Sequence, residues 1–553
     1  MRSKTIRRSG AALAVGLIAS TALVACAGAP GGPGGKPPKE EFTYQLTTMT
    51  PAPTTEVDSV SWNLFQGEPW TLNPFTSADF APNMVGSNMC ETLLQQTPEF
   101  EIKPNLAASW ENPDPLTWVY QLRDDVTFWD GSPMTAEDVA ATMTHSQTDP
   151  TSFQHANYSS VESVTATGEF EVTVKLKTPN YLFHKQLASF VGVVMQKEFI
   201  EAHAEDLGTP SVGVMCTGPF QFTKWDQGDS ITLSRYDGYW NDKLRPKAKE
   251  LKFTFLTDDT AITSALLSGE IDGTYNPPSS STQQLLSSDA GELAFGPAPL
   301  VVTTFYTNPD GAMADPAIRE ALQLATDWSG IARQAFGGIG KASALQTPPA
   351  AFGTSASAMD VLDQEFATDG KADIEAAKQA LEGASPEAKA KTIKMVVPEQ
   401  SETQQLGLAV EDAAKKLGLD FKLTVSPANQ YTNYLYDPET RGDTDILYTT
   451  FWPNIPDPLD WMQITSVTGG SFNSYGYTGI DELFAKAVQI EDDAERAKVT
   501  AEMARISREE LLPMTPGITQ DNAVWQNSRI TGAPAAFDYT FYPWAAHIGG
   551  TGK

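Results

Sequence analysis

The sequence is poor in the side chains that most often carry metal or redox chemistry. It has three cysteines and five histidines among 553 residues. It contains no H-E-x-x-H or C-x-x-C pattern, two common spacings of zinc ligands. It also lacks a G-x-S-x-G nucleophile motif, and Gly337–Lys341 lacks the Ser or Thr that follows the lysine of a phosphate-binding loop. We therefore expect no enzyme, no catalytic residues, no metal site and no cofactor.

Basic residues are also scarce. The 38 lysines and arginines face 69 aspartates and glutamates, so the formal net charge is −31. Four of the 38 lie in the first 25 residues, which hold no acid, so the rest of the chain has 34 basic and 69 acidic residues, or −35. A field of this sign repels nucleic acid and anionic lipid. We expect no nucleic-acid partner and interpret the acid excess as a source of solubility.

Long apolar runs are limited to one stretch near the N-terminus. Ala11–Val24 follows the basic segment Arg2–Arg8 and is too short to span a bilayer comfortably. Leu23–Cys26 looks like a bacterial lipobox, in which the cysteine receives lipid and becomes the mature N-terminus; several acyl chains anchor a protein stably. We predict a lipoprotein signal peptide over residues 1–25 and lipidation at Cys26. The alternative is an ordinary Ala-x-Ala cleavage that leaves a spare thiol.

The segment after the lipobox is rich in Gly, Pro and Thr and has almost no apolar periodicity. This composition predicts a flexible, lipid-anchored linker over residues 26–57. Folding is expected to begin at residue 58, because Val60–Leu64 alternates like a strand. Since no later run is long enough for a transmembrane helix, we expect the protein in the cell envelope, lipid-anchored at the extracytoplasmic face of the plasma membrane.

The most informative stretch of the chain runs from Asn105 to Val139. Within it, Trp118–Arg123 alternates aromatic or apolar residues with mixed ones, which predicts a strand. Val126–Trp129 predicts a second short strand. Thr135 is placed to cap the helix that follows, with Asp138 in its first turn. This pattern is typical of a packed structural unit rather than a catalytic loop.

The same stretch resembles the signature of the family 5 extracellular solute-binding proteins, the peptide- and nickel-type receptors of ABC importers. That signature reads roughly L-A-x-S-W, then W-x-F-x-L-R-x-x-V-x-F-x-D-G-x-P-x-T-A-x-D-V. Further blocks follow in the family's order, namely Cys216–Phe222, Leu266–Asp272, Asp315–Asp327 and Tyr448–Pro458. The resemblance extends from about Asp58 to the C-terminus.

The resemblance implies an α/β, two-lobed periplasmic-binding-protein-like fold (type II, cluster C) with an extra subdomain inserted in lobe one. A chain of this length is also unlikely to form a single core. The expected divisions are lobe I at 58–91, 207–300 and 516–553, the inserted subdomain at 92–206, and lobe II at 301–515. Apolar spacing further predicts a helix over Met84–Gln96 and a strand over Phe170–Leu176.

The resemblance also bears on the two remaining cysteines. It puts Cys90 and Cys216 near the first lobe, in a chain exported to an oxidising space. We predict a disulfide between them, and the alternative is two separately buried thiols.

Receptors of this type bind ligand between domains and close around it by hinge motion, as the resemblance implies. In peptide-binding members the ligand lies as an extra strand against two receptor segments, which align with Ala78–Phe80 and Phe451–Asn454. The predicted ligand-binding residues are Ala78, Asp79, Phe80, Phe451, Trp452, Pro453, Asn454 and Asp457. For Phe451 and Trp452 the alternative is core packing, and for Asn454 it is turn geometry before Pro456.

The second segment departs from the family's pattern, which reads about W-x-x-D-x-x-D-P. Asp457 is kept, but the family's acid for the peptide α-ammonium is Asn454 here. A charged hydrogen bond contributes about 1.5–3 kcal/mol, and an unpaired buried ammonium costs several. Pro453 also removes one backbone donor. We therefore expect free peptides to bind more weakly, unless Asp79 or another acid substitutes.

The resemblance implies a monomer that captures a small organic solute and delivers it to ABC permease subunits. Our first hypothesis is an oligopeptide-class solute. The amide of Asn454 and the indole of Trp452 also suit a sugar-containing ligand, so a carbohydrate or glycolipid receptor is the second. A non-transporting regulatory lipoprotein is the third. Under the first hypothesis, Asn454→Asp is expected to raise the affinity for free peptides.

Overall fold

The computed structural model describes residues 43–77 and 79–552. The predicted signal peptide, the lipidation site Cys26, most of the predicted linker and the candidate residue Ala78 lie outside the described residues. The remaining part of the predicted linker belongs to the compact body, which begins at Tyr44.

The start of the body at Tyr44 corrects the expected start at residue 58. The Tyr44 hydroxyl donates to Asp521 at 2.7 Å. Thr50 is buried, and its hydroxyl donates to the backbone carbonyl of Ala533 at 2.8 Å. These partners come from the far end of the chain, so the composition of the segment gives no sign of them.

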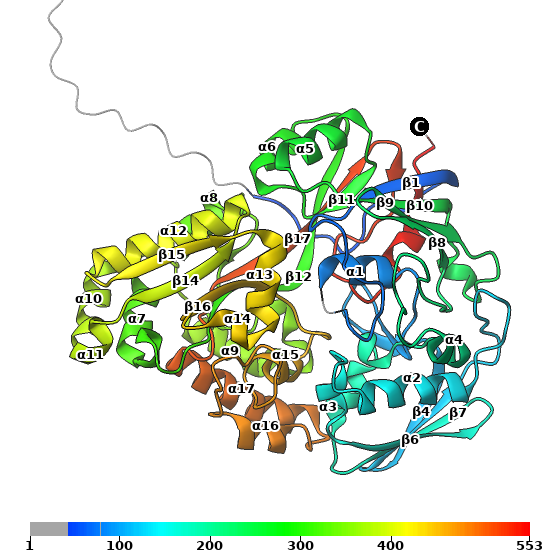
Figure 1. The fold of residues 1–553 in the computed structure, drawn as a ribbon, viewed down its shortest axis with the longest axis horizontal. Helices are drawn as coiled ribbons and strands as arrows, with labels where there is room; N and C mark the ends of the chain where they lie inside the picture. Colours follow the sequence, from blue (N-terminus) through cyan, green and yellow to red (C-terminus); the bar gives the residue numbers. More distant parts are fainter. Residues whose placement is uncertain (1–42, 78, 553) are drawn as a thin grey trace, which may run out of the picture. The chain divides into compact units, whose positions relative to one another are not determined.

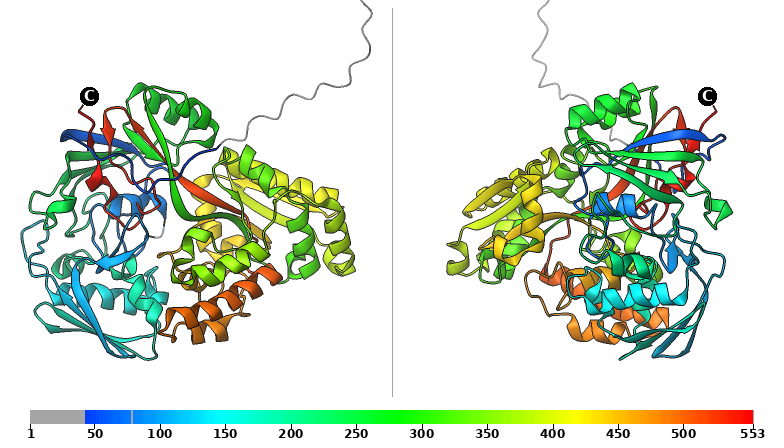
Figure 2. Two further views of the ribbon diagram at one scale, coloured as in Figure 1. Left: turned by 180° about the vertical axis from the view of Figure 1, so that it is seen from behind. Right: turned by 45° about the vertical axis from the view of Figure 1, so that its right-hand side comes forward.

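The body is built on an 11-stranded sheet with the order β15-β14-β16-β12-β17-β11-β1-β10-β9-β8, and β13 pairs with β17 off this path. Figures 1 and 2 show β12 and β17 running between the two halves of the molecule. The strands are β1 (Val57–Asn63), β8 (Phe220–Asp226), β9 (Ser230–Arg235), β10 (Ala248–Thr254), β11 (Gly273–Tyr275), β12 (Gly291–Tyr306), β13 (Lys341–Ala342), β14 (Ile393–Pro398), β15 (Phe421–Ser426), β16 (Ile446–Phe451) and β17 (Ile518–Asn527).

We call the half that holds β1 and β8–β11 the first lobe. Its core includes the buried aromatic residues Trp62, Tyr275 and Trp544, with the Trp62 and Trp544 ring centroids 4.7 Å apart. Its helices and short strands are α1 (Phe80–Gly86), α5 (Asp259–Ser268), α6 (Thr282–Leu286), β18 (Ile530–Thr531) and β19 (Gly549–Gly550).

We call the half that holds β14–β16 the second lobe. β14 pairs in parallel with β15 and β16, and its apolar sequence is typical of a strand covered on both faces. Its helices are α7 (Pro316–Ala325), α8 (Trp328–Gln334), α9 (Ala356–Glu365), α10 (Ile374–Glu382), α11 (Pro386–Lys389), α12 (Ser401–Lys416), α13 (Ala428–Tyr436), α14 (Pro438–Arg441), α15 (Pro458–Thr465), α16 (Asp481–Ala487) and α17 (Asp493–Glu510).

A separate antiparallel sheet, in the order β4-β5-β7-β6, lies beside the first lobe with α2 packed on it (Figure 1). Its elements and neighbours are β2 (Leu94–Gln96), β3 (Ile102–Pro104), β4 (Ala107–Asp114), β5 (Thr117–Leu122), α2 (Ala136–Thr148), β6 (Val161–Gly168), β7 (Glu171–Leu176), α3 (Tyr181–Gln186) and α4 (Lys197–Ala202). This sheet falls within the stretch expected as an inserted subdomain. The exact division of the chain at residues 92, 207, 301 and 516 stays a prediction.

The strand–helix unit forms largely as its sequence indicates. Trp118 and Tyr120 of β5 are buried, and Thr135 and Asp138 form a capping box at the start of α2. Two expectations are wrong. Val126–Trp129 makes only an isolated bridge, Thr127 to Pro133, and the helix expected over Met84–Gln96 ends at Gly86. The chain then turns and enters β2.

Cys90 and Cys216 form a disulfide, which confirms the predicted pairing. The bond joins the turn after α1 to the segment before β8 and spans 126 residues of sequence. It therefore closes the base of the loop that carries the separate four-stranded sheet.

Candidate functional site

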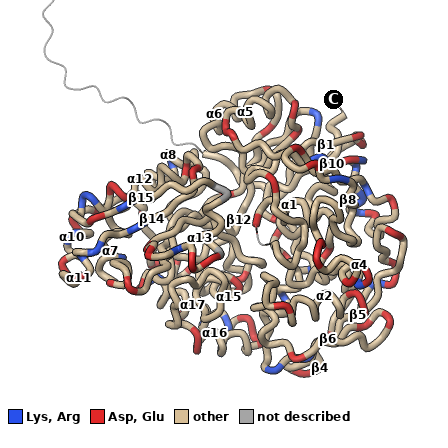
Figure 3. Tube along the Cα trace, viewed as in Figure 1, with Lys and Arg blue, Asp and Glu red and all other residues tan. Residues whose placement is uncertain are grey.

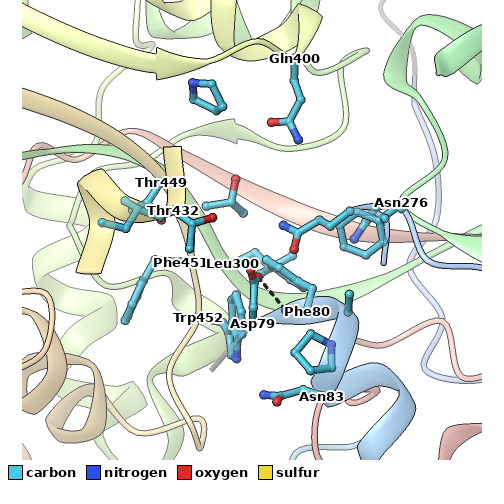
Figure 4. Close-up of a pocket in the computed structure, with 18 of the residues that line it drawn as sticks. Asp79, Phe80, Asn83, Asn276, Leu300, Gln400, Thr432, Thr449, Phe451 and Trp452 are labelled. Atoms are coloured by element: carbon cyan, nitrogen blue, oxygen red, sulfur yellow. Dashed lines mark hydrogen bonds between the residues drawn. The ribbon is translucent and has the colours of Figure 1, made fainter. Parts of the chain in front are cut away.

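A cavity of about 1060 Å³ lies between the two lobes. Its wall combines α1 and the N-terminus of α5 from the first lobe with β16, α13 and the N-terminus of α12 from the second. Figure 4 shows side chains from both lobes facing one another across this space. The volume slightly exceeds the roughly 300–1,000 Å³ range of small-molecule pockets, which leaves room for an extended solute.

Asp79 lies in the cavity wall at the N-terminus of α1. It is the N-cap residue of this helix, and its Oδ1 accepts from the backbone N–H of Phe80 at 2.7 Å. Burial raises the pKa of Asp79 to about 6, although the hydrogen bond from Phe80 acts in the opposite direction. The carboxyl is therefore mostly ionised at about pH 7, and a ligand ammonium at this end of the cavity would gain a counter-ion.

Phe80 and Trp452 connect the two predicted ligand-binding segments directly. Their ring centroids are 3.9 Å apart, and Phe537 packs against both rings. Both residues also line the cavity. Phe451 lines it too, but its ring makes edge contacts with Trp461 and Phe472, so it combines core packing with a place in the wall.

The cavity-facing edge of β16 is only partly paired. β14 meets β16 at Ile446 and Leu447, whereas the opposite edge pairs with β12 along its whole length. The Tyr431 hydroxyl bonds both the N–H and the C=O of Tyr448 on the free side. Because backbone groups alternate between strand edges, the N–H and C=O of Thr450 face that same side, beside the cavity that Thr450 lines.

Asn454 is oriented by a buried acid that sequence reasoning did not single out. Asp460 is fully buried and accepts from the Asn454 backbone N–H at 2.6 Å, with the Asn454 amide 3.4 Å away. Asp460 also accepts from Gln186 of α3 at 2.6 Å. A carboxylate at position 454 would therefore face Asp460, which works against the affinity gain expected for Asn454→Asp.

Two predicted residues are not among those that line the cavity, namely Pro453 and Asp457. Asp457 is the N-cap of α15 and accepts from the backbone N–H of Leu459 at 3.0 Å. It also forms an ion pair with Lys185 at 3.2 Å. Together with the Gln186–Asp460 bond, this contact ties α3 to the second lobe. The retained Asp-Pro pair thus starts a helix and holds two parts of the molecule together.

We expect the buried Asp460 carboxyl to make stability depend on pH. Burial raises its pKa to about 6, above 3.8, so the folded state binds more protons than the unfolded state between these values. The free energy of unfolding should therefore fall by up to about 3 kcal/mol as the pH rises from about 4 to 6. Asp460→Asn should remove that part of the slope. Urea melts across this range test it, and identical slopes in both proteins would contradict the expectation.

Several cavity residues were missed by sequence reasoning, among them Asn276, Gln400, Tyr431, Thr432, Thr449 and Thr450 (Figure 4 labels four of them). Thr449 and Thr450 directly precede the predicted segment, so extending that segment along its strand would have found them. Asn276 has a left-handed backbone with φ of 42°. This conformation has no sequence signal beyond the tolerance of asparagine for it.

In the part of the chain that the structure describes, no helix is long and apolar enough to cross a membrane. Within the same residues, no three His, Cys, Asp or Glu side chains gather in a way that would hold a metal ion.

A protein-family model, described as bacterial extracellular solute-binding proteins, family 5 Middle, matches residues 101–473. The glutathione-binding protein GsiB of Salmonella paratyphi A is 25% identical over 281 residues, which cover 50% of this chain and 54% of that protein. This chain thus matches about half the length of that relative. The periplasmic murein peptide-binding protein MppA of Escherichia coli K12 is 23% identical over 444 residues, which cover 76% and 80%.

Solved structures show the same fold. AgaA from A. tumefaciens R10, in complex with agropinic acid, superposes with a TM-score of 0.77 at 21% identity, covering 89% of this chain and 98% of that one. This similarity confirms the predicted α/β, two-lobed, type II periplasmic-binding-protein-like fold.

Proposed function

The chain belongs to the bacterial extracellular solute-binding proteins of family 5, and from this premise we propose that it captures an oligopeptide-class solute between its lobes and delivers it to an ABC permease. As a member of this family it is a receptor rather than an enzyme. We further propose that it acts as a monomer anchored by lipid at Cys26. The names of two relatives, which bind glutathione and murein peptides, support a peptide-like solute.

The observation that carries the proposal is the free edge of β16 beside the cavity. The N–H and C=O of Thr450 are positioned to pair with an extended ligand backbone, as an added strand pairs with a sheet edge. Asp79 would receive the ammonium of such a ligand, and Phe80 and Trp452 would cover its side chains. Pro453 and Asp457 would then act on the shape of the second lobe rather than on the ligand.

A single change in the ligand tests the backbone pairing. N-methylation of a peptide nitrogen that pairs with Thr450 removes one donor, and we expect this to weaken binding about tenfold. Scanning the methyl group along one peptide in calorimetric titrations should give a strong effect at alternate positions, because only every second residue faces the strand edge. Equal affinities at every position would contradict the proposal.

A carbohydrate or glycolipid ligand is the second candidate. Trp452 in the cavity wall and the amide side chains of Asn276, Gln400 and Asn454 favour it, because aromatic and amide groups suit sugar rings and hydroxyls. Binding of an oligosaccharide, together with failure of all short peptides, would favour this reading. If no small solute binds, a non-transporting regulatory lipoprotein is favoured.

A further inference from the structure

The charged side chains in the cavity wall all have the same sign. Among the described residues that line the cavity there is no lysine, arginine or histidine, and the acids are Glu68, Asp79, Asp258, Asp259, Glu399 and Glu402. At the chain's own ratio of 38 basic to 69 acidic residues, six charged positions would include about two basic ones. Figure 3 shows that lysines and arginines do occur on both lobes.

Besides Asp79, which caps α1, two of these acids make hydrogen bonds that stabilise the fold. Glu68 accepts from the indole N–H of Trp225 at 2.7 Å. Asp258 is the N-cap of α5 and accepts from the backbone N–H of Ala261 at 2.8 Å. Their presence in the wall therefore needs no ligand to explain it.

Asp259 and Glu402 differ, because they line the cavity from opposite lobes. Asp259 is the first residue of α5 in the first lobe, and Glu402 lies in the first turn of α12 in the second. Burial raises the pKa of Glu402, and the negative charge of Asp259 on the other lobe raises it further. Among the described residues, no side chain donates a hydrogen bond to the Glu402 carboxylate, whereas the Ser280 hydroxyl donates to Asp259 at 3.2 Å.

We propose that the solute is a cation and that Asp259 and Glu402 hold its positive group between the lobes. This inference rests on the proposed function and narrows its ligand to one charge class. Like charges on the two walls of the cavity oppose the approach of the lobes, whereas a cation between them attracts both. Binding of a cation would therefore favour closure of the two lobes.

The rest of the wall suits the same ligand. Phe80, Phe255 and Trp452 line the cavity, and aromatic faces attract ammonium and guanidinium groups. Among the described lining residues, an anionic solute such as glutathione would meet six acids and no positively charged side chain. The positive N-termini of α5 and α12 would attract it, but each is already occupied by an acid of its own first turn.

Short peptide amides that differ only in one central residue test the charge class. Calorimetric titration at about pH 7 should give the lysine peptide at least about tenfold higher affinity than its glutamine counterpart, with the glutamate peptide weakest. Glu402→Gln and Asp259→Asn should each remove most of the advantage of lysine over glutamine and leave binding of the glutamine peptide nearly unchanged. Asp412→Asn, an exposed acid on α12 paired with Lys416, is the matched control and should preserve the advantage.

The outcomes separate this inference from the proposed function. Binding of all three peptides with no preference for lysine, or with a preference for glutamate, would overturn the inference and leave an oligopeptide receptor. An unchanged lysine advantage in both variants would overturn the assigned roles of Asp259 and Glu402. Failure of every peptide to bind would remove the proposed peptide function, and the inference with it.

Discussion

Replacing Asp79 by asparagine is expected to weaken the binding of a peptide with a free α-ammonium by about 30- to 1,000-fold at about pH 7, because truncating one partner of a desolvated charge pair costs about 2–4 kcal/mol. Asp79 lines the cavity. Asn454 stands at the position where the family resemblance leads us to expect an acid for the ammonium. The substitution should leave the helix cap in place, since asparagine is as good an N-cap residue as aspartate. Asp79→Asn should therefore lower the affinity for the peptide and leave the stability of the protein unchanged.

Calorimetric titration with a short alanine peptide and its N-acetylated form isolates this effect. Asp79→Asn should lower the affinity only for the peptide with a free ammonium, whereas the acetylated peptide should bind the wild type and the variant equally. Asp327→Asn is a matched control, because Asp327 caps α8, a helix of the same length as α1, and does not line the cavity. Equal binding of both peptides by both proteins would contradict the assignment of Asp79.

The same carboxyl predicts how affinity depends on pH. Burial raises the pKa of Asp79 to about 6, so the carboxylate that attracts the ammonium is lost as the pH falls through that value. We expect the wild-type affinity for the free-ammonium peptide to fall about tenfold between about pH 7 and 5. In Asp79→Asn this part of the pH dependence should be absent.

Removing the disulfide with Cys90→Ser and Cys216→Ser is expected to lower the free energy of unfolding by about 2–5 kcal/mol. The bond spans 126 residues, so its loss releases a long loop in the unfolded chain. The folded state should keep its other contacts around Cys90 when the disulfide is removed. Glu91, next to Cys90, accepts from the Thr217 hydroxyl at 2.9 Å and the Trp240 indole at 3.0 Å.

Urea unfolding measured with and without reductant tests this expectation. The reduced wild type should unfold at the same urea concentration as the double serine variant, and solute affinity below the transition should change little. A free-thiol count supplies the direct check. In the denatured, unreduced protein carrying Cys26→Ser, two free thiols would contradict the disulfide.

Local features of this chain were predictable from its sequence. The alternation of Trp118–Arg123 and the capping residues Thr135 and Asp138 act over a few residues, and β5 and α2 form where they indicate. The helix expected over Met84–Gln96 failed because its apolar residues serve other contacts. Met89 and Leu93 are buried in the segment between α1 and β2, which also contains the disulfide-bonded Cys90.

For the site, only the meeting of two segments could be predicted, because the family resemblance assigned both of them to the ligand-binding site. Phe80 and Trp452 do meet, 372 positions apart in the chain. The roles of Asn454 and Asp457 could not be predicted from the sequence, because they depend on contacts with Asp460, Gln186 and Lys185. Gln186 is 274 residues away from Asp460, and no periodicity or spacing within one segment reveals a partner at that distance.

The most direct test of a cationic solute held between the lobes is native mass spectrometry of the protein as purified, followed by denaturing release of the bound solute. We predict one small, cationic, amine-bearing solute per chain, which is lost from Asp79→Asn and reduced in Glu402→Gln. Release of an anionic solute that survives both substitutions would contradict it.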